Sequence, residues 1–154
     1  MISLNENIYC PKYLGVYISE RIIPVLFDNA IWMGIENIGY DFLVNNNCKL
    51  DIKGSCICTD GKWHYLFRQN CIADYFMLFA FDNRIELNVL HIWMIGSNEL
   101  SKHKKKFCEL KGTAITNSEK VLKWYEKYEL KDKLNVANRI CKKLKNESFD
   151  NWFR

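Results

Sequence analysis

Apolar residues recur every four positions near the start of the chain, and they predict a first helix over residues 13–27. The apolar stripe consists of Leu14, Ile18, Ile22 and Leu26. A stripe of this kind is the face that a helix buries against a core. Pro24 lies inside the pattern, so we expect the helix to kink or end close to it. Glu20 is the only acid in a second row, which is otherwise made of aromatic residues and proline.

The middle of the chain is rich in branched and aromatic residues and predicts a β-sheet. Strands are expected over residues 40–44, 49–58, 63–68, 74–81 and 87–95. Three asparagines at 45–47 predict a hairpin turn between the first two strands, because Asn tolerates left-handed backbone. Asp60-Gly61 predicts a second turn, so residues 49–68 are expected to form a meander. The last two strands are so continuously apolar that we expect them to be central and covered on both faces.

From residue 101 onward the chain is basic and its pattern is helical. A short basic run covers residues 101–107, and helices are expected over about 118–128 and 132–145. No repeat or linker indicates a second domain, and 154 residues suit one. We therefore expect a single α/β domain with an N-terminal helix, a central mixed sheet that contains a hairpin, and C-terminal basic helices.

Composition narrows the class of protein further. Apolar residues make up 49% of the chain and aromatic residues 14%, which is enough for a real core. No apolar run approaches the roughly 20 residues that a membrane span needs. The first residues lack a basic region followed by an apolar stretch, so no signal peptide is expected. We expect a cytoplasmic protein with no membrane partner.

The cysteines and histidines do not form a recognisable framework. There are seven cysteines, an odd number, and their spacing is not that of a disulfide-rich fold. Cys56-x-Cys58 is half of a zinc-binding pattern, but no second Cys/His pair follows at the usual ligand spacing. His64, His91 and His103 are scattered, and each is expected to be an ordinary strand or surface residue. We therefore expect reduced, mostly buried thiols.

Charge is distributed unevenly along the chain. Residues 1–98 contain 7 Lys or Arg and 10 Asp or Glu, a net of −3, whereas residues 99–154 contain 15 and 8, a net of +7. An acidic first part followed by a basic one would supply a metal site and a phosphate-contacting surface. The same lysines also suit an ordinary solvated helical surface, and charge alone does not separate the two interpretations.

The candidate chemistry lies in the segment GYDFLVNNNCKLDIKGS, residues 39–55. Side chains alternate along a strand, so Asp51 and Lys53 are expected on one face with apolar neighbours on the other. The hairpin would bring Asp41 close to Asp51. Two close carboxylates repel each other unless a cation lies between them, and a hard divalent ion is the usual solution. A plain surface hairpin with an Asp–Lys pair is the alternative interpretation.

This order of residues resembles the PD-(D/E)xK nuclease superfamily, which includes restriction enzymes, homing endonucleases and archaeal-type Holliday junction resolvases. The family places an acid at the start of one strand and an acid-x-lysine on the next. Asp41 and Asp51-Ile-Lys53 match these positions. Glu20 matches the glutamate that many members carry on the first helix. The likeness covers residues 13–95.

The resemblance implies a restriction-endonuclease-like core over residues 11–98, with a basic helical extension over 99–154. Two departures from the family pattern are Tyr40, where the family name has proline, and Asp51, where many members have glutamate. Both variations occur within the family. One nuclease domain would then span the whole chain, residues 1–154.

The activity that the resemblance implies is endonucleolytic hydrolysis of DNA phosphodiester bonds, of restriction, homing or resolvase type. Asp41, Asp51 and Glu20 would hold Mg²⁺, or Mn²⁺ in its place. Lys53 would orient or help deprotonate the attacking water and offset developing negative charge. Gln69, after a strand end, is a candidate helper. Many such enzymes are homodimers, because cutting two strands suits two-fold symmetry.

The basic region then gains a role as the DNA-contacting surface. The lysines expected to contact backbone phosphates are Lys102, Lys104, Lys105, Lys106 and Lys111. Two alternatives remain: a non-catalytic nucleic-acid-binding module on the same fold, and an interaction protein whose Trp-rich strands and basic helices bind a protein partner. The acid–acid–lysine set favours the enzyme, since a pure binder would not need carboxylates facing a polyanion.

Overall fold

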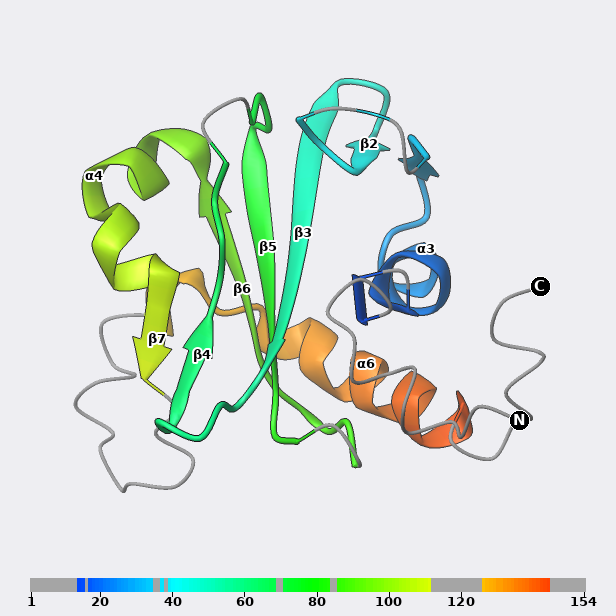
Figure 1. The fold of residues 1–154 in the computed structure, drawn as a ribbon. Helices are drawn as coiled ribbons and strands as arrows, with labels where there is room; N and C mark the ends of the chain where they lie inside the picture. The colour runs from blue at the N-terminus through cyan, green and yellow to red at the C-terminus, as the bar shows by residue number, and fades with distance from the viewer. Residues whose placement is uncertain are drawn as a thin grey trace.

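A five-stranded mixed sheet forms the centre of the structure, which is a computed structural model (Figure 1). The structure describes residues 14–15, 17–34, 37, 39–68, 71–83, 86–111 and 126–144, and for 104–111 and 143–144 it describes the backbone alone. The strands, in sheet order, are β1 (Ala30–Trp32), β2 (Phe42–Val44), β3 (Cys48–Cys56), β5 (Tyr75–Phe81) and β6 (Val89–Gly96). A separate two-stranded sheet pairs β4 (Lys62–His64) with β7 (Glu109–Lys111).

The predicted hairpin is confirmed as the connection between β2 and β3. The two strands pair antiparallel, with Phe42 opposite Leu50 and Val44 opposite Cys48. Asn45 and Asn46 have φ values of 53° and 64°, so the turn uses the left-handed backbone that Asn tolerates. β3 then pairs in parallel with β5. A parallel pair needs a crossover, and residues 57–74, which include β4, supply it.

Helices cover one face of the sheet, which we call the helix face. The π-helical turn η1 (Ile18–Ile22), α3 (Ile23–Leu26) and α6 (Lys131–Leu144) lie on this side (Figure 1). Their apolar side chains and alternate residues of the strands form the larger core cluster. Its most deeply buried members include Ile18, Ile22, Leu50, Met77 and Phe79.

The opposite face, which we call the β4 face, is covered by α4 (Ser97–Cys108), by β4 and by the residues that follow β4. In Figure 1, α4 and the β4–β7 pair lie on the other side of the sheet from α3. The cluster here includes Trp63, Tyr65, Phe67, Phe76, Leu78 and Trp93. The sheet therefore separates two apolar layers, and each strand contributes to both by alternation.

The first helix follows the prediction, including the effect of Pro24. Pro24 has no N–H to donate to the carbonyl four residues back. The backbone widens just before it, and the N–H of Ile23 donates to the carbonyl of Ile18, five residues away. α3 continues from there and ends where Phe27 is extended, with φ −132° and ψ 124°. The expected kink is thus a π-helical turn.

Two expectations about the strands were wrong. Residues 49–68 do not form a meander, because β4 pairs with β7 instead of β3. Trp63 drives this departure: its side chain is fully buried on the β4 face, and its Nε1 donates to the carbonyl of Phe81 at 2.8 Å. β6 lies at the edge of the sheet instead of its centre. The N–H of Leu130, which donates to the carbonyl of Ile92 at 2.8 Å, helps to cover that edge.

The C-terminal helices are confirmed in part. α6 matches the helix expected over 132–145, and its Ala137 and Cys141 are buried. The basic run at 101–107 belongs to α4, which begins earlier, at Ser97. The helix expected over 118–128 lies outside the described residues, apart from the 3-10 turn η2 (Glu126–Tyr128). Among the described residues, no helix is long and apolar enough to cross a membrane.

Gly54 on β3 lets the first helix pack closely on the sheet. A Cβ at this position would lie 2.6 Å from Cδ1 of Ile18 and 3.2 Å from Cδ2 of Leu14. Both side chains are buried, so they have little room to move away. We expect Gly54→Ala to lower the free energy of unfolding by roughly 1–3 kcal/mol, measured by urea denaturation.

Gly96→Ala is the matched control for this prediction. Gly96 ends β6, and a Cβ there would meet Cε1 of Tyr75 at 3.7 Å, which is an ordinary contact. We expect this variant to be neutral or slightly more stable than wild type, because alanine loses less backbone entropy on folding than glycine. Equal effects of the two substitutions would contradict the close helix–sheet packing at Gly54.

Candidate functional site

Asp41 and Asp51 face each other across the β2–β3 hairpin. Phe42 lies opposite Leu50, so the next pair along the same register is Asp41 and Asp51. The N–H of Asp41 donates to the carbonyl of Leu50 at 2.9 Å, which continues the pairing one residue beyond β2. Oδ2 of Asp41 accepts a hydrogen bond from the N–H of Ile52 at 2.8 Å. Side chains directly opposite in an antiparallel pair lie on the same face, which brings the two carboxylates together.

Lys53 completes the group from the same strand as Asp51. Its Nζ lies 3.0 Å from Oδ2 of Asp51. The same Nζ lies 5.6 Å from the centre of the Phe67 ring, on the β4 face. Leu50 and Ile52 belong to the core on the helix face. The alternation expected from the sequence is therefore confirmed, and the charged pair and its apolar neighbours are on opposite faces of β3.

Burial makes this group electrostatically unfavourable on its own. The pKa of Asp41 is raised from 3.8 to about 6, and burial is the largest cause. The hydrogen bond from the N–H of Ile52 opposes this rise. The negative charge of Asp51 also raises the pKa, and the positive charge of Lys53 lowers it. Asp51 is only 9% exposed. Two carboxylates and one ammonium thus share a partly desolvated site, and the single lysine does not balance both acids.

Lys53 is the charge partner of one oxygen of Asp51. Oδ2 is buried and has no hydrogen-bond donor among the described residues. Nζ of Lys53 lies 3.0 Å from this oxygen as an ion pair. The ammonium of Lys53 compensates the charge of this oxygen, but it does not also balance the charge of Asp41. The oxygen donors of Asp41 and Asp51 therefore fit a hard divalent cation such as Mg²⁺.

Cys71 lies close to this group, and no sequence pattern indicates it. Sγ of Cys71 donates to the carbonyl of Gly39 at 2.9 Å, and the N–H of Ile72 donates to the same carbonyl at 3.2 Å. Burial raises the pKa of the Cys71 thiol, and the negative charge of Asp51 contributes to this rise. A hydrogen bond from the backbone at Ala73 has the opposite effect and lowers the pKa. Cys71 and Phe67 both come from the crossover, whose path the sequence pattern does not specify.

The structure does not bring Glu20 together with the two aspartates. Glu20 lies on η1, which packs on the helix face, whereas Asp51 lies on the β4 face. Its side chain is half-buried. Among the described residues it forms no group of three ligand atoms with Asp41 and Asp51. A role for Glu20 in metal binding stays a prediction.

The remaining candidates can be placed only in part. Gln69 lies outside the described residues. Lys102 is exposed on α4, which packs on the β4 face. The backbones of Lys104, Lys105 and Lys106 continue α4, and that of Lys111 ends β7, but the side chains of these four lysines are outside the described part.

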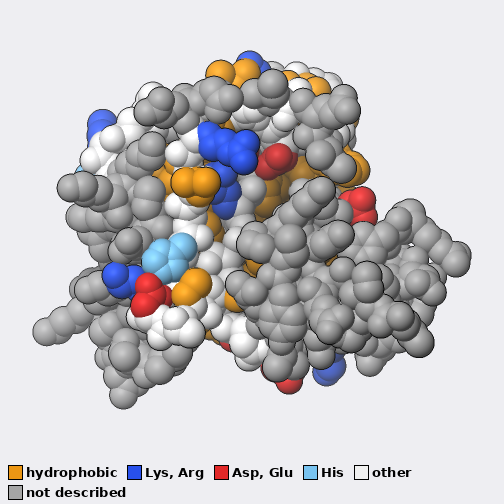
Figure 2. Space-filling model, viewed as in Figure 1, with side chains coloured by type: hydrophobic (Ala, Val, Ile, Leu, Met, Phe, Trp, Pro, Cys, Tyr) orange, Lys and Arg blue, Asp and Glu red, His pale blue; other side chains and the backbone are white. Residues whose placement is uncertain are grey.

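The surface view shows how charged side chains gather on one side of the molecule. In Figure 2, basic side chains adjoin an acidic one in the upper half of the view. Lower down, a histidine lies beside an acidic and a basic side chain. Charges of both signs thus lie together in two places in this view, and further charged side chains lie along its rim.

No family model matches this chain, and no curated protein matches it. The function therefore has to be inferred from the geometry and chemistry of its own residues.

Replacing Asp41 should stabilise the metal-free protein at neutral pH. A carboxyl whose pKa is raised by folding contributes stability below its unfolded pKa, and this contribution is lost as the pH rises through about 6. We expect Asp41→Asn, in the presence of EDTA, to raise the free energy of unfolding at pH 7.5 by on the order of 1–3 kcal/mol. The asparagine Oδ1 can still accept the hydrogen bond from Ile52.

The pH dependence identifies the cause of this stabilisation. The gain should shrink as the pH falls from about 6 toward 4, where the wild-type carboxyl is protonated, and urea denaturation at several pH values measures it. Asp28→Asn, at an exposed turn position, is the control and should show no such trend. A metal-free Asp41→Asn protein that is less stable than wild type at pH 7.5 would contradict the destabilising effect of burying the Asp41 carboxylate.

Proposed function

We propose that this chain is a metal-dependent endonuclease that hydrolyses phosphodiester bonds in DNA. The observation that carries the proposal is the group of two opposed carboxylates and one lysine, with Lys53 Nζ 3.0 Å from Asp51 Oδ2. The arrangement agrees with what the resemblance to PD-(D/E)xK nucleases implies for Asp41, Asp51 and Lys53. A restriction-endonuclease-like core is part of this proposal.

Asp41 and Asp51 would hold Mg²⁺ or Mn²⁺. The ion supplies charge stabilisation at the phosphate and lowers the pKa of a bound water. The burial of Asp51 and the raised pKa of Asp41 both favour a bound cation over an unoccupied pair of acids.

Lys53 would act on the attacking water and on the phosphate. Asp51 and the Phe67 ring hold its ammonium on the β4 face, so little side-chain entropy is lost when substrate binds. From that position a lysine can orient the water and offset negative charge that develops on the phosphate. Lys53 is partly buried, so water screens the attraction between its ammonium and the phosphate less than it would at the surface.

The basic helix α4 would position the DNA. It packs on the same face of the sheet as Asp51 and Lys53, and from residue 99 onward it lies in the region 99–154, which has a net charge of +7. Contacts from Lys102, Lys104, Lys105, Lys106 and Lys111 to backbone phosphates would hold a duplex without reading its sequence. Two copies of the chain, as a homodimer, would place one site at each strand.

Plasmid cleavage tests the proposed activity. Purified protein with Mg²⁺ should nick or linearise supercoiled plasmid, and EDTA should abolish the reaction. We expect Asp51→Asn and Lys53→Met to cleave at least about 100-fold more slowly, because each removes a group that stabilises developing charge. The rate of loss of supercoiled DNA on agarose gels measures the effect.

Matched controls separate catalysis from general surface charge. Lys131→Met removes an exposed lysine that pairs with Glu126 on the surface, and Asp28→Asn removes an exposed acid, so both should cleave like wild type. Circular dichroism checks that every variant is folded. DNA binding without cleavage in Mg²⁺ or Mn²⁺, or equal cleavage by Asp51→Asn and wild type, would refute the proposal.

A further inference from the structure

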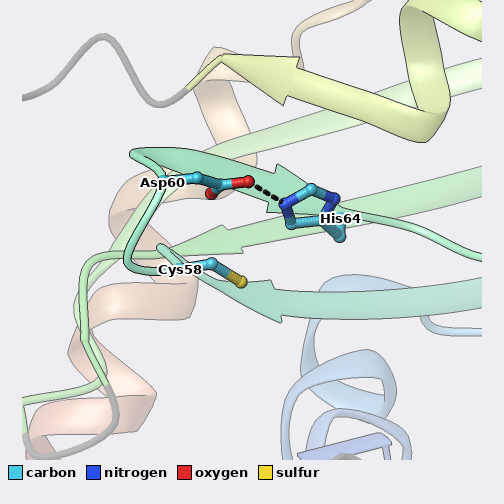
Figure 3. A group of neighbouring side chains, drawn as sticks. All are labelled: Cys58, Asp60 and His64. Carbon is cyan, nitrogen blue, oxygen red and sulfur yellow. Dashed lines mark hydrogen bonds and ion pairs between the residues drawn. The ribbon is translucent and has the colours of Figure 1, made fainter.

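Three potential metal ligands of different types meet at the turn between β3 and β4 (Figure 3). The Sγ of Cys58, a carboxylate oxygen of Asp60 and a ring nitrogen of His64 all lie within 4.8 Å of one another. Nε2 of His64 is 2.7 Å from Oδ2 of Asp60. Figure 3 shows Asp60 reaching the His64 ring, with Cys58 on the neighbouring segment.

Backbone hydrogen bonds hold the turn in the shape that brings these side chains together. The N–H of Gly61 donates to the carbonyl of Cys58 at 2.9 Å, and the N–H of Cys58 donates to the carbonyl of Lys62 at 2.9 Å. Gly61 has a φ of 75°, a conformation that glycine adopts without strain. Oδ1 of Asp60 accepts the N–H of Lys62 at 3.0 Å, which leaves Oδ2 directed at His64. The ligands are therefore positioned before any ion binds.

The distances match the size of a transition-metal site. Zinc binds thiolate sulfur at about 2.3 Å and imidazole nitrogen or carboxylate oxygen at about 2.0–2.2 Å, so two ligand atoms of a tetrahedral site lie roughly 3.3–3.6 Å apart. The three side chains need only small rotations to reach that range. The side chains of His64 and Asp60 are 41% and 46% exposed, so an ion can reach them from solvent.

The donor chemistry selects the kind of ion. Thiolate and imidazole favour Zn²⁺ and its close analogues over Mg²⁺. One thiolate and one carboxylate balance the two charges of the ion, so the bound site would be neutral near the surface. Three protein ligands leave a fourth tetrahedral position for water.

We propose that Cys58, Asp60 and His64 bind a Zn²⁺-class ion that fixes the turn from β3 into β4. Asp51 and Lys53 lie at least five residues from Cys58 along an extended strand, roughly 16 Å, so this is a second site. The turn leads into Trp63, which is fully buried on the β4 face. An ion here would stabilise the start of the crossover.

Cobalt(II) reports on the site directly, because a Co²⁺–thiolate bond gives a charge-transfer band in the near ultraviolet. Chelator-treated, reduced protein would be titrated with Co²⁺ and then with Zn²⁺ as the competitor. We expect one equivalent of Co²⁺ to bind with this band and Zn²⁺ to displace it. Cys58→Ser should lose the band. His64→Ala and Asp60→Asn should bind Zn²⁺ at least about tenfold more weakly.

Cys48→Ser is the matched control, because Cys48 is another free, half-buried cysteine of the described residues and lies at the far end of β3. This variant should bind like wild type. Asp60→Asn keeps an oxygen acceptor for the N–H of Lys62, so it tests the ligand without removing the turn. Absence of the band in wild type, or an unchanged band in Cys58→Ser, would overturn the proposal. The readout is independent of DNA cleavage.

Discussion

The pairing register between β2 and β3 is the constraint on which the rest of the structure depends. Phe42 lies opposite Leu50, and this pairing fixes which side chains of β3 reach each face of the sheet. A slip of one residue would turn Leu50 toward the β4 face and bury Asp51 and Lys53 in the helix-side core. Burying charges there would cost several kcal/mol per ion. The left-handed turn after β2 and the alternation along β3 therefore specify the same register.

The electrostatic character of the aspartate pair comes from the crossover that covers the β4 face. The hydroxyl of Tyr65 donates to the carbonyl of Phe79 at 2.9 Å, which anchors this segment to β5, and Phe67 then lies beside Lys53. Without that cover, Asp51 and Lys53 would form an exposed ion pair, and such pairs contribute little to stability. The crossover displaces water from this site, and burial is therefore the largest cause of the raised pKa of Asp41. The chemistry of the hairpin is thus set by residues from elsewhere in the chain.

The sequence predicts features that depend on local rules and misses those that depend on distant partners. Alternation placed Asp51 and Lys53 together, and the asparagine turn placed Asp41 near them. The residues of β4 alternate like any strand, so their pattern could not say that they pair with β7. β6 appeared central because both of its faces are buried, while its edge is covered in part by Leu130, far along the chain. Cys58, Asp60 and His64 do not follow the paired Cys/His spacing of zinc motifs, so the sequence pattern does not indicate that they meet at one turn.

The two proposed metal sites differ in donor chemistry and in their surroundings, which would let one chain hold two kinds of ion. Asp41 and Asp51 offer only carboxylate oxygens in a partly buried position, which suits a hard ion that keeps much of its water. Cys58 and His64 offer sulfur and nitrogen at the surface, which suits a softer ion with few ligands. Zinc would prefer the turn, and Mg²⁺ has little affinity for a thiolate. β3 would then connect two metal sites with different roles. The ion at Asp41 and Asp51 would act on the substrate, and the ion at Cys58, Asp60 and His64 would stabilise the crossover that covers the aspartates.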